Sequence, residues 1–477
     1  MLTTVQKDDD TIRAADGITR VELVMGVIRA RIADRSLGLG ARLPSIRSLV
    51  ASLQVSKSTV VDAYDRLSAE GVIVSRQGAG FYVASGVRQF VVTKTGPRPE
   101  RDVDPLWMTR HSLEADATGL RPGCGWLPDA WMPDEAMRQS LRQSARDQSA
   151  NLVSYDVPQG HVGLRQVLCR HLKERAIDAT PSQIILTNST TPGIDLACRL
   201  LLEPGDTVLV DEPSYFNFLA LLRVARVNIV GIPFTPHGPD LEKFEAALKE
   251  QAPRLYLTNA TVHNPTGASL SLNIAYRLLK LAEAYDLIII EDDIFADFEV
   301  ETTPRLAALD GLNRVIYVGG FSKTLSASLR CGFVAIRQEL IEPLIEVKLS
   351  TQSGGGPASA DVIYRALTNG FYRRHTASLK ARLGTAMGAA TTRLKQAGLT
   401  PWIEPRGGMF IWAELPDGLH AADVARAALA EGMLLAPGDA FSIAKTPSRF
   451  LRFNASQCSD PQIFPTLQRA MKKAGQL

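Results

Sequence analysis

Apolar residues at the start of the chain recur at the spacing of a helix. They predict a first helix from Ile18 onward, which Gly38 and Gly40 end. Ser45 and Ser56 are placed to cap a second and a third helix, because a serine hydroxyl at this position accepts a hydrogen bond from the helix start. The predicted buried face of the third helix consists of Val60, Ala63, Tyr64 and Leu67.

Two short β-type runs follow the third helix, which Gly71 is expected to stop. The runs are residues 72–74 and 81–83, and the polar, glycine-containing stretch 75–80 lies between them. This pattern is typical of a β-hairpin. Three helices and a hairpin together predict a winged helix-turn-helix domain over residues 17–85.

The pattern changes again after residue 104, where helical stretches alternate with short, continuous apolar runs. The runs are residues 184–187, 207–210, 255–258, 287–290 and 315–318. Apolar strands separated by helices are typical of a buried, mostly parallel α/β sheet. We therefore predict an α/β domain over residues 105–477, joined to the first domain by a linker at 86–104 that contains Gly96-Pro97-Arg98-Pro99.

Composition is ordinary for a folded chain of 477 residues, with 45% hydrophobic and 22% charged residues, which excludes a wholly disordered protein. The net charge of +3 hides an asymmetry: residues 17–90 carry ten basic and five acidic residues, or +5, and the remainder carries −2. No apolar run is long enough to span a bilayer, and the N-terminus has no signal-peptide pattern. Five scattered cysteines predict neither a metal site nor disulfides. We expect a cytoplasmic protein with no membrane partner.

The basic first domain has side chains suited to DNA. Lys57, Ser58 and Thr59 lie in the first turn of the predicted third helix, away from its apolar face. A helix N-terminus can enter the major groove or bind phosphate. Arg47, early in the second helix, and Arg76, in the hairpin, are expected phosphate contacts. A solvated, charged face is the alternative explanation for any one of these residues alone.

The stretch RLPSIRSLVASLQVSKSTVVDAYDRLSAEGVIVSRQGAGFYV resembles the GntR family of bacterial winged-helix repressors. The elements LPS-x-R, VS-x-x-TV, AY-x-x-L and a G-x-G wing occur in the order of that family. The resemblance implies binding to double-stranded DNA through Arg47, Ser56, Lys57, Ser58, Thr59 and Gly78. Val61 departs from the pattern, because some family members carry a basic DNA contact there, and the affinity or the half-site is expected to differ accordingly.

Polar residues directly follow the strands predicted for the second domain, at the sheet edge where ligands bind. The segments are Asn188–Thr191, Asp211–Tyr215, His263–Gly267, Glu291–Asp293 and Gly319–Lys323. With Arg330 they offer a lysine, an acid pair, an asparagine and a hydroxyl-rich helix start. Pyridoxal phosphate fits this set, because its aldehyde needs an amine, its ring nitrogen a carboxylate, and its phosphate an arginine and a helix N-terminus. Read singly, the lysine and the aspartate are more often surface or strand-end residues.

Residues 105–477 resemble the class I aminotransferases of the aspartate aminotransferase superfamily. The motifs are HNPTG at 263–267, IIIEDDIFADF at 288–298 and FSKTLSASLRCG at 321–332. The resemblance implies that Lys323 forms a Schiff base with pyridoxal phosphate, that Asp292 pairs with its ring nitrogen and that Asn264 donates to its phenolic oxygen. It further implies phosphate binding by Ser322, Arg330, Thr190 and Thr191, ring stacking by Tyr215, a phosphate contact from Tyr155 across a dimer interface, and a carboxylate site at Arg452.

Two departures from the aminotransferase pattern concern the chemistry of the site. Phe295 stands where these enzymes usually have a tyrosine whose hydroxyl tunes the Schiff base. Ser189 and Pro192 replace a common glycine and glutamine in the phosphate loop. The ion-pairing groups remain, so we expect cofactor binding to persist and transamination to be weak or absent.

A GntR-type reader fused to an aminotransferase-like domain resembles the MocR subfamily of transcriptional regulators. The leading hypothesis is a homodimeric, pyridoxal-phosphate-dependent regulator that senses an amino compound, or the cofactor itself, through an internal or external aldimine on Lys323. A working aminotransferase with an autoregulatory DNA-binding head is the first alternative. A scaffold that binds neither DNA nor cofactor is the second.

Overall fold

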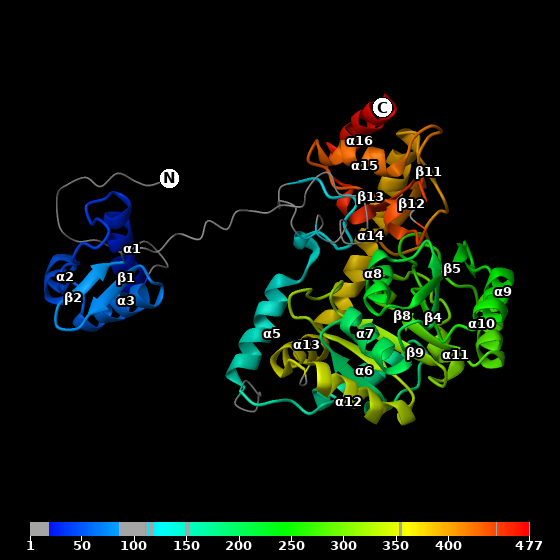
Figure 1. The fold of residues 1–477 in the computed structure, drawn as a ribbon, viewed down its shortest axis with the longest axis horizontal. Coiled ribbons are helices and arrows are strands. Elements are labelled where there is room, and N and C mark those ends of the chain that lie inside the picture. The colour runs from blue at the N-terminus through cyan, green and yellow to red at the C-terminus, as the bar shows by residue number, and fades with distance from the viewer. Residues whose placement is uncertain are drawn as a thin grey trace. The chain divides into compact units, whose positions relative to one another are not determined.

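The computed structural model describes residues 19–84, 110, 113, 119–147, 153–352, 355–444 and 446–476. The chain forms two compact units, residues 1–96 and 97–477, here called the N-terminal and C-terminal units (Figure 1). The predicted linker at 86–104 lies outside the described residues.

The N-terminal unit contains three helices and a two-stranded hairpin. They are α1 (Arg20–Ala33), α2 (Ile46–Leu53), α3 (Lys57–Ala69), β1 (Ile73–Arg76) and β2 (Gly80–Val83). The hydroxyls of Ser45 and Ser56 cap α2 and α3, as predicted. Tyr64 of α3 is buried, donates a 2.7 Å hydrogen bond to the carbonyl of Pro44, and packs edge-on against Phe81 of the hairpin. The arrangement is the predicted winged helix-turn-helix.

Two local boundaries differ from the prediction. Helix α1 ends at Ala33, before the glycines expected to end it, because Arg35 takes a left-handed backbone conformation with φ of 64°. The strands of the hairpin continue into the stretch expected to be a loop, so that Arg76 pairs with Gly80. The turn is therefore tighter than predicted, and the φ of 73° at Gly78 explains the glycine there.

The C-terminal unit is built on an eight-stranded sheet with the order β3-β10-β9-β8-β7-β4-β5-β6. Its strands are β3 (Ile184–Thr187), β4 (Thr207–Glu212), β5 (Asn228–Thr235), β6 (Gly238–Pro239), β7 (Leu255–Thr258), β8 (Ile288–Asp292), β9 (Val315–Gly320) and β10 (Gly332–Ala335). The neighbours from β9 to β5 are parallel, whereas β10 is antiparallel to β3 and β9. The mostly parallel α/β fold is confirmed, and all five predicted strands are present.

Both faces of the sheet are covered by helices (Figure 1). One core receives α6 (Val162–Lys173), α9 (Leu241–Gln251), α10 (Leu272–Ala284), α11 (Leu306–Asp310) and α13 (Pro357–Thr368), and the other receives α7 (Thr190–Leu201), α8 (Phe216–Val224) and α12 (Ile341–Gln352). Helix α5 (Asp134–Arg146) packs on α13. Successive strand residues enter opposite cores, as Ile289 and Ile290 do, which explains the continuous apolar runs.

A second, four-stranded antiparallel sheet forms a C-terminal lobe that the sequence did not predict. Its order is β11 (Thr400–Pro401), β12 (Phe410–Glu414), β14 (Phe450–Asn454) and β13 (Ala436–Pro437), and it is accompanied by α15 (Ala421–Leu429) and α16 (Ile463–Ala474). The long helix α14 (Phe371–Gln396) runs into this lobe. Its first turn places Tyr372 in the core of the large sheet, whereas Leu394 lies in the core of the lobe. Among the described residues, no helix is long and apolar enough to cross a membrane.

Candidate functional site

The first turn of α3 presents a polar surface on the N-terminal unit. Lys57 and Ser58 are exposed, and Thr59 is half-buried. The Ser56 hydroxyl accepts a hydrogen bond of 3.1 Å from the Thr59 amide and lies 2.8 Å from the Ser58 hydroxyl. Ser56 therefore has a structural role as a helix cap that the sequence also predicted, in addition to the DNA contact implied for it.

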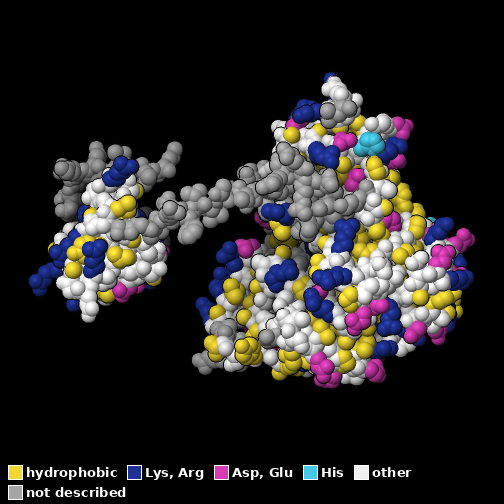
Figure 2. Space-filling view, viewed as in Figure 1, with side chains coloured by type: hydrophobic (Ala, Val, Ile, Leu, Met, Phe, Trp, Pro, Cys, Tyr) yellow, Lys and Arg dark blue, Asp and Glu magenta, His cyan; other side chains and the backbone are white. Residues whose placement is uncertain are grey.

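Arginines on the second helix and the hairpin extend this surface. Arg47 and Arg76 are both exposed, and Figure 2 shows Lys and Arg side chains on the face of the N-terminal unit turned to the viewer. The Arg76 guanidinium lies over the Tyr82 ring, 4.5 Å from its centre. This cation–π contact holds the charge at the hairpin, next to the turn at Gly78.

The C-terminal unit contains a cavity of about 410 Å³ at the carboxyl ends of its parallel strands. Nine residues predicted for the cofactor or its effector line it: Thr190, Thr191, Tyr215, Asn264, Asp292, Ser322, Lys323, Arg330 and Arg452. Tyr155 does not line it, and its side chain is 89% exposed on the surface of the unit. That position leaves the side chain accessible to a partner subunit, as the resemblance implied.

One end of the cavity is suited to a phosphate, because helix α7 begins there with Thr190. Arg330 donates a 2.9 Å hydrogen bond from Nη2 to the Ser189 hydroxyl. Ser189 has φ of 117° and ψ of −178°, a conformation that residues other than glycine rarely adopt. The serine has therefore kept the backbone of the glycine it replaces. Gly332 lets β10 approach this turn, since a Cβ there would meet the Ser189 backbone at 2.5 Å.

Lys323 lines the cavity and is half-buried. Its Nζ donates a 2.7 Å hydrogen bond to the carbonyl oxygen of Gly125. Burial, followed by the positive charge of Arg452, lowers the pKa of Lys323 to about 8. A lysine with this pKa has a substantial neutral fraction near neutral pH, and the neutral amine is the form that attacks an aldehyde.

Asp292 ends β8 and is 3% exposed. Burial raises its pKa to about 7, against the opposing effect of a 3.1 Å hydrogen bond from the Ile294 amide. Asn259 supports it, because Nδ2 donates to the Asp292 carbonyl while Oδ1 accepts from the Asn264 amide at 3.1 Å. A buried carboxyl of this kind is stabilised as an anion when a cation, such as a protonated ring nitrogen, lies beside it.

Arg452 of β14 is 1% exposed and also lines the cavity. Its Nη1 donates to Oδ1 of Asn264 at 2.8 Å and its Nη2 to the carbonyl of Gly123 at 2.7 Å. Its guanidinium lies 4.5 to 5.8 Å from the ring centres of Phe410, Phe441 and Phe216. Nε has no hydrogen-bond partner among the described residues, and burial lowers the pKa of Arg452 to about 10. A buried cation with an unused donor is suited to an anionic ligand group.

Phe295 also lines the cavity, where its ring packs edge-on against Phe410 at 5.3 Å between centres. The tyrosine hydroxyl common in aminotransferases is therefore replaced by a hydrocarbon edge. Asn264 is left as the polar neighbour on that side of the cavity.

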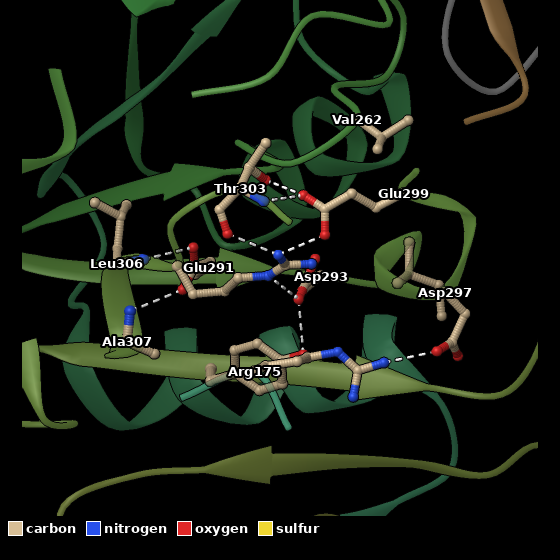
Figure 3. A network of polar contacts seen from close by, with 12 residues as sticks. Arg175, Val262, Glu291, Asp293, Asp297, Glu299, Thr303, Leu306 and Ala307 are labelled. Atoms are coloured by element: carbon tan, nitrogen blue, oxygen red, sulfur yellow. Dashed lines mark hydrogen bonds and ion pairs between the residues drawn. The ribbon is translucent and has the colours of Figure 1, made fainter. Parts of the chain in front are cut away.

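A network of buried charges lies next to the cavity, on the turn that follows Asp292 (Figure 3). Arg305 donates to Asp293 at 3.0 Å and to Glu299 at 2.6 Å, and the side chains of Arg305 and Asp293 are at most 1% exposed. Glu291 accepts 2.9 Å hydrogen bonds from the amides of Leu306 and Ala307, while burial raises its pKa to about 7. The network holds both neighbours of Asp292 in the sequence.

The cavity also contains residues that the sequence did not predict for the site, among them Gly125, Trp126 and Asn259. Gly125 and Trp126 line its wall, and Gly125 contributes only a backbone carbonyl, which no side-chain pattern reveals. Asn259 follows β7 by one residue, so the rule that directed attention to strand ends could have identified it.

The chemistry of this donor set fits pyridoxal phosphate. Lys323 offers the amine, Asp292 the carboxylate, and Arg330 with the start of α7 the phosphate contacts. Arg452, with its unused Nε, remains available for a carboxylate on a second molecule. No group of histidine, cysteine and acidic side chains that could hold a metal ion occurs among the described residues.

Comparison with known proteins finds a matching family for each of the two units. The family of aminotransferases of class I and II matches residues 128–469, and the gntR family of bacterial regulatory proteins matches residues 21–83. The HTH-type transcriptional regulator YdfD of Bacillus subtilis, described as uncharacterized, is 27% identical, and the alignment spans 91% of this chain and 92% of that protein. The probable rhizopine catabolism regulatory protein MocR of Rhizobium meliloti is 27% identical, over 86% of this chain and 84% of its own.

Solved structures resemble the C-terminal part of the chain. The kynurenine aminotransferase of Pyrococcus horikoshii superposes with a TM-score of 0.72 at 25% identity, over 79% of this chain and 95% of its own. LysN, the α-aminoadipate aminotransferase of Thermus thermophilus, gives a TM-score of 0.71 at 24% identity, over 77% and 96%. The chain therefore belongs to the class I and II aminotransferases, a family that depends on pyridoxal phosphate, and carries at its N-terminus a helix-turn-helix domain of the gntR family.

Proposed function

We propose that this protein is a transcriptional regulator that binds pyridoxal phosphate in its C-terminal unit and double-stranded DNA with its N-terminal unit, and that it responds to an amino compound or to the cofactor itself. The observation that carries the proposal is the convergence of Lys323, Asp292, Arg330 and Arg452 on one cavity. In the same chain, the N-terminal unit exposes three basic side chains, Arg47, Lys57 and Arg76. A regulator of this kind acts in the cytoplasm, where the chromosome is.

Each residue around the cavity has a role in this proposal. When bound, the cofactor supplies an aldehyde that bonds covalently to amines. Lys323 holds this aldehyde, Asp292 holds a proton at the ring nitrogen, and Asn264 donates to the phenolic oxygen. The remaining cofactor contacts are Ser322, Arg330, Thr190 and Thr191 at the phosphate, Tyr215 at the ring, and Tyr155 from a partner subunit.

The unused Nε and the two Nη groups of Arg452 define the site for an effector. A carboxylate can accept two hydrogen bonds from a guanidinium, and the surrounding phenylalanine rings exclude water that would weaken this pair. We propose an effector that carries both an amine, which reaches Lys323 and the cofactor, and a carboxylate, which binds Arg452.

DNA binding in the proposal rests on the surface of α2, α3 and the hairpin. Lys57 and the hydroxyls of Ser58 and Thr59 contact base edges or phosphates, while Arg47, Arg76 and the backbone at Gly78 contact phosphates. Ser56 fixes the first turn of α3 from which these side chains project. A homodimer would present two such heads, and an effector that binds one arrangement of the subunits better than another shifts DNA affinity by that difference.

A spectral titration followed by DNA binding tests the proposal. Holo-protein is titrated with a panel of amines, amino acids and carboxylates, and DNA affinity is measured with each compound that shifts the visible absorbance. We expect the absorbance band to be absent in Lys323→Ala and at least one amino acid to change DNA affinity. A protein that forms no band with pyridoxal phosphate would contradict the cofactor role. A band without DNA binding would contradict the regulatory role.

Turnover separates a regulator from an enzyme, and the observation that bears on it is Phe295. Without a hydroxyl at this position, we expect multiple turnovers with an amino acid and a keto acid to be slower than about 1 per second, the lower end of ordinary enzyme rates. Phe295→Tyr is expected to increase turnover about tenfold or more, because the hydroxyl adds a donor to the cavity. Rapid turnover by the wild type would favour a working aminotransferase with an autoregulatory head.

A further inference from the structure

Lys323 and Asp292 are each followed in the sequence by a buried polar residue. Asp293 follows Asp292, and Thr324 follows Lys323. Buried polar side chains thus lie next to the residue that carries the amine and next to the residue that carries the carboxylate. Side chains among the described residues connect the turn after Asp292 with Thr324.

The turn after Asp292 is anchored at both of its ends. At the first end, Asp293 accepts hydrogen bonds from Nε of Arg305 at 3.0 Å and from the Tyr317 hydroxyl at 2.8 Å. At the other end, Asp297 accepts a 2.7 Å hydrogen bond from Nη2 of Arg175, as Figure 3 shows. The path from Asp292 to Asp297 is therefore fixed by two arginines.

Helix α14 joins this turn to the residue after Lys323. The Tyr372 hydroxyl donates to Asp297 and lies 3.2 Å from the Thr324 hydroxyl. Because the single hydroxyl proton of Tyr372 is used by the carboxylate, the Thr324 hydroxyl is the donor in that second contact. One helical turn later, His375 Nε2 lies 2.8 Å from the Thr324 carbonyl, which can only accept, so Nε2 carries the proton.

Resting on the function proposed above, we propose that Tyr372 and His375 are positioning residues that hold the Lys323 amine in the cavity by fixing Thr324. They touch neither the amine nor the ligand sites. The hydroxyl and the carbonyl of Thr324 both form hydrogen bonds with side chains of α14. The backbone that carries Lys323 therefore moves with this helix. Tyr372 ties the same helix to the turn of Asp292, which sets the distance between amine and carboxylate.

The pKa of the Lys323 amine distinguishes the proposal from a purely structural role of Tyr372, because a residue that only supports the fold would leave this pKa unchanged. The charged and titratable groups around Lys323 are Arg452, Cys124, Asp292 and Arg330, and none is altered by a change at Tyr372. If Tyr372 fixes the amine, its loss lets Nζ move toward water, and the pKa of Lys323 rises from about 8 toward its ordinary value.

The experiment measures how fast full-length apoprotein forms the visible band with pyridoxal phosphate, at pH values from about 6 to 10. In Tyr372→Phe we expect the inflection of this rate to move upward by about half a unit or more, because the substitution removes the hydrogen bonds of Tyr372 to Thr324 and Asp297. Tyr364→Phe is the matched control, since Tyr364 packs against the same core but belongs to α13 and forms none of the network's hydrogen bonds described above.

Thr324→Val removes the hydrogen bond between Thr324 and Tyr372 but leaves the bond from Tyr372 to Asp297, so it should shift the inflection upward by no more than Tyr372→Phe does. Thr324→Ser retains the hydroxyl and should match the wild type. The double variant Tyr372→Phe/Thr324→Val should shift no further than Tyr372→Phe alone, because that variant has already lost the bond to Thr324. Folded variants with an unchanged inflection would overturn the inference and leave the proposed function intact. A wild type that forms no band at all would overturn both.

Discussion

The side-chain amine of Lys323 donates a 2.7 Å hydrogen bond to the backbone carbonyl of Gly125. The carbonyl of Gly123, two residues earlier, accepts from Arg452 at 2.7 Å. One short loop thus accepts one hydrogen bond from each of two cations that the proposed ligands would engage. Neither cation is left without an acceptor in the ligand-free chain, which limits the cost of burying both.

The pKa of Lys323 predicts how cofactor capture depends on pH. Only the neutral amine attacks, so between about pH 6 and 8 the rate is expected to rise roughly tenfold per unit and to level off above the amine pKa. Stopped-flow absorbance after mixing apoprotein with pyridoxal phosphate measures it. Lys323→Ala should form no band at any pH; a band in that variant would assign the covalent bond to another lysine.

Substitution of Arg452 should separate effector binding from cofactor binding. Arg452→Lys retains a positive charge but loses the planar pair of donors, so we expect amino-acid affinity to fall about ten- to a hundredfold while the cofactor band persists. Absorbance titration measures both. An amine without a carboxylate is the control, and its affinity should be unchanged; equal losses for both ligands would mean that Arg452 supports the cavity rather than the carboxylate.

Asp292 should make the apoprotein less stable at high pH. A carboxyl whose folded pKa of about 7 exceeds its unfolded value contributes stability that is present at low pH and is lost as the pH rises through about 7. When the pH rises from about 5 to about 8, the unfolding free energy of the wild type is therefore expected to fall by about 2 kcal/mol relative to that of Asp292→Asn.

Urea unfolding of the apoprotein, followed by tryptophan fluorescence, measures this effect, since all five tryptophans lie after residue 100. Asp195→Asn is the control, because Asp195 pairs with Arg199 on the surface of α7, where the exchange should have little effect. A pH-independent difference between Asp292→Asn and wild type would show that the carboxyl is already ionised and compensated in the apoprotein.

Lys57 should contribute one counterion to DNA binding. In Lys57→Ala the slope of log affinity against log salt is expected to fall by about 1 on any duplex, if the side chain neutralises a phosphate. Fluorescence anisotropy at several salt concentrations measures the slope. Arg66, on the same helix, is engaged by Asp62 at 3.0 Å, so Arg66→Ala should leave it unchanged. Equal effects of the two substitutions would indicate a diffuse electrostatic contribution.

Apolar periodicity was sufficient to predict the parts of the fold whose pattern is local. The helix caps at Ser45 and Ser56 and the five central strands follow from spacing and burial alone. Strand β10 was not predicted, because its four residues, Gly332–Ala335, begin at the last residue of the FSKTLSASLRCG motif and give no pattern of their own. The four-stranded C-terminal sheet was missed for a similar reason, since two of its strands have only two residues each.

The polar side chains that line the cavity could be picked out from motifs, whereas the contacts that support them could not. Lys323, Asp292 and Asn264 lie in recognisable segments, and the structure brings them to one cavity. The Lys323 amine bonds to the backbone carbonyl of Gly125. Thr324, the next residue, bonds to Tyr372, which lies 48 residues further along the chain. Contacts between distant segments leave no periodicity, so a single sequence does not reveal them.

Helix α14 begins in the core of the large sheet and ends in the core of the C-terminal lobe. Its 26 residues make a rod about 39 Å long. A tilt of roughly 5° about the end at Tyr372 would displace the far end by about 3 Å, which is comparable to the rise of two residues along a helix. A tilt of α14 that hardly moves the backbone at Lys323 would thus displace the other end of the helix, in the C-terminal lobe, by about 3 Å.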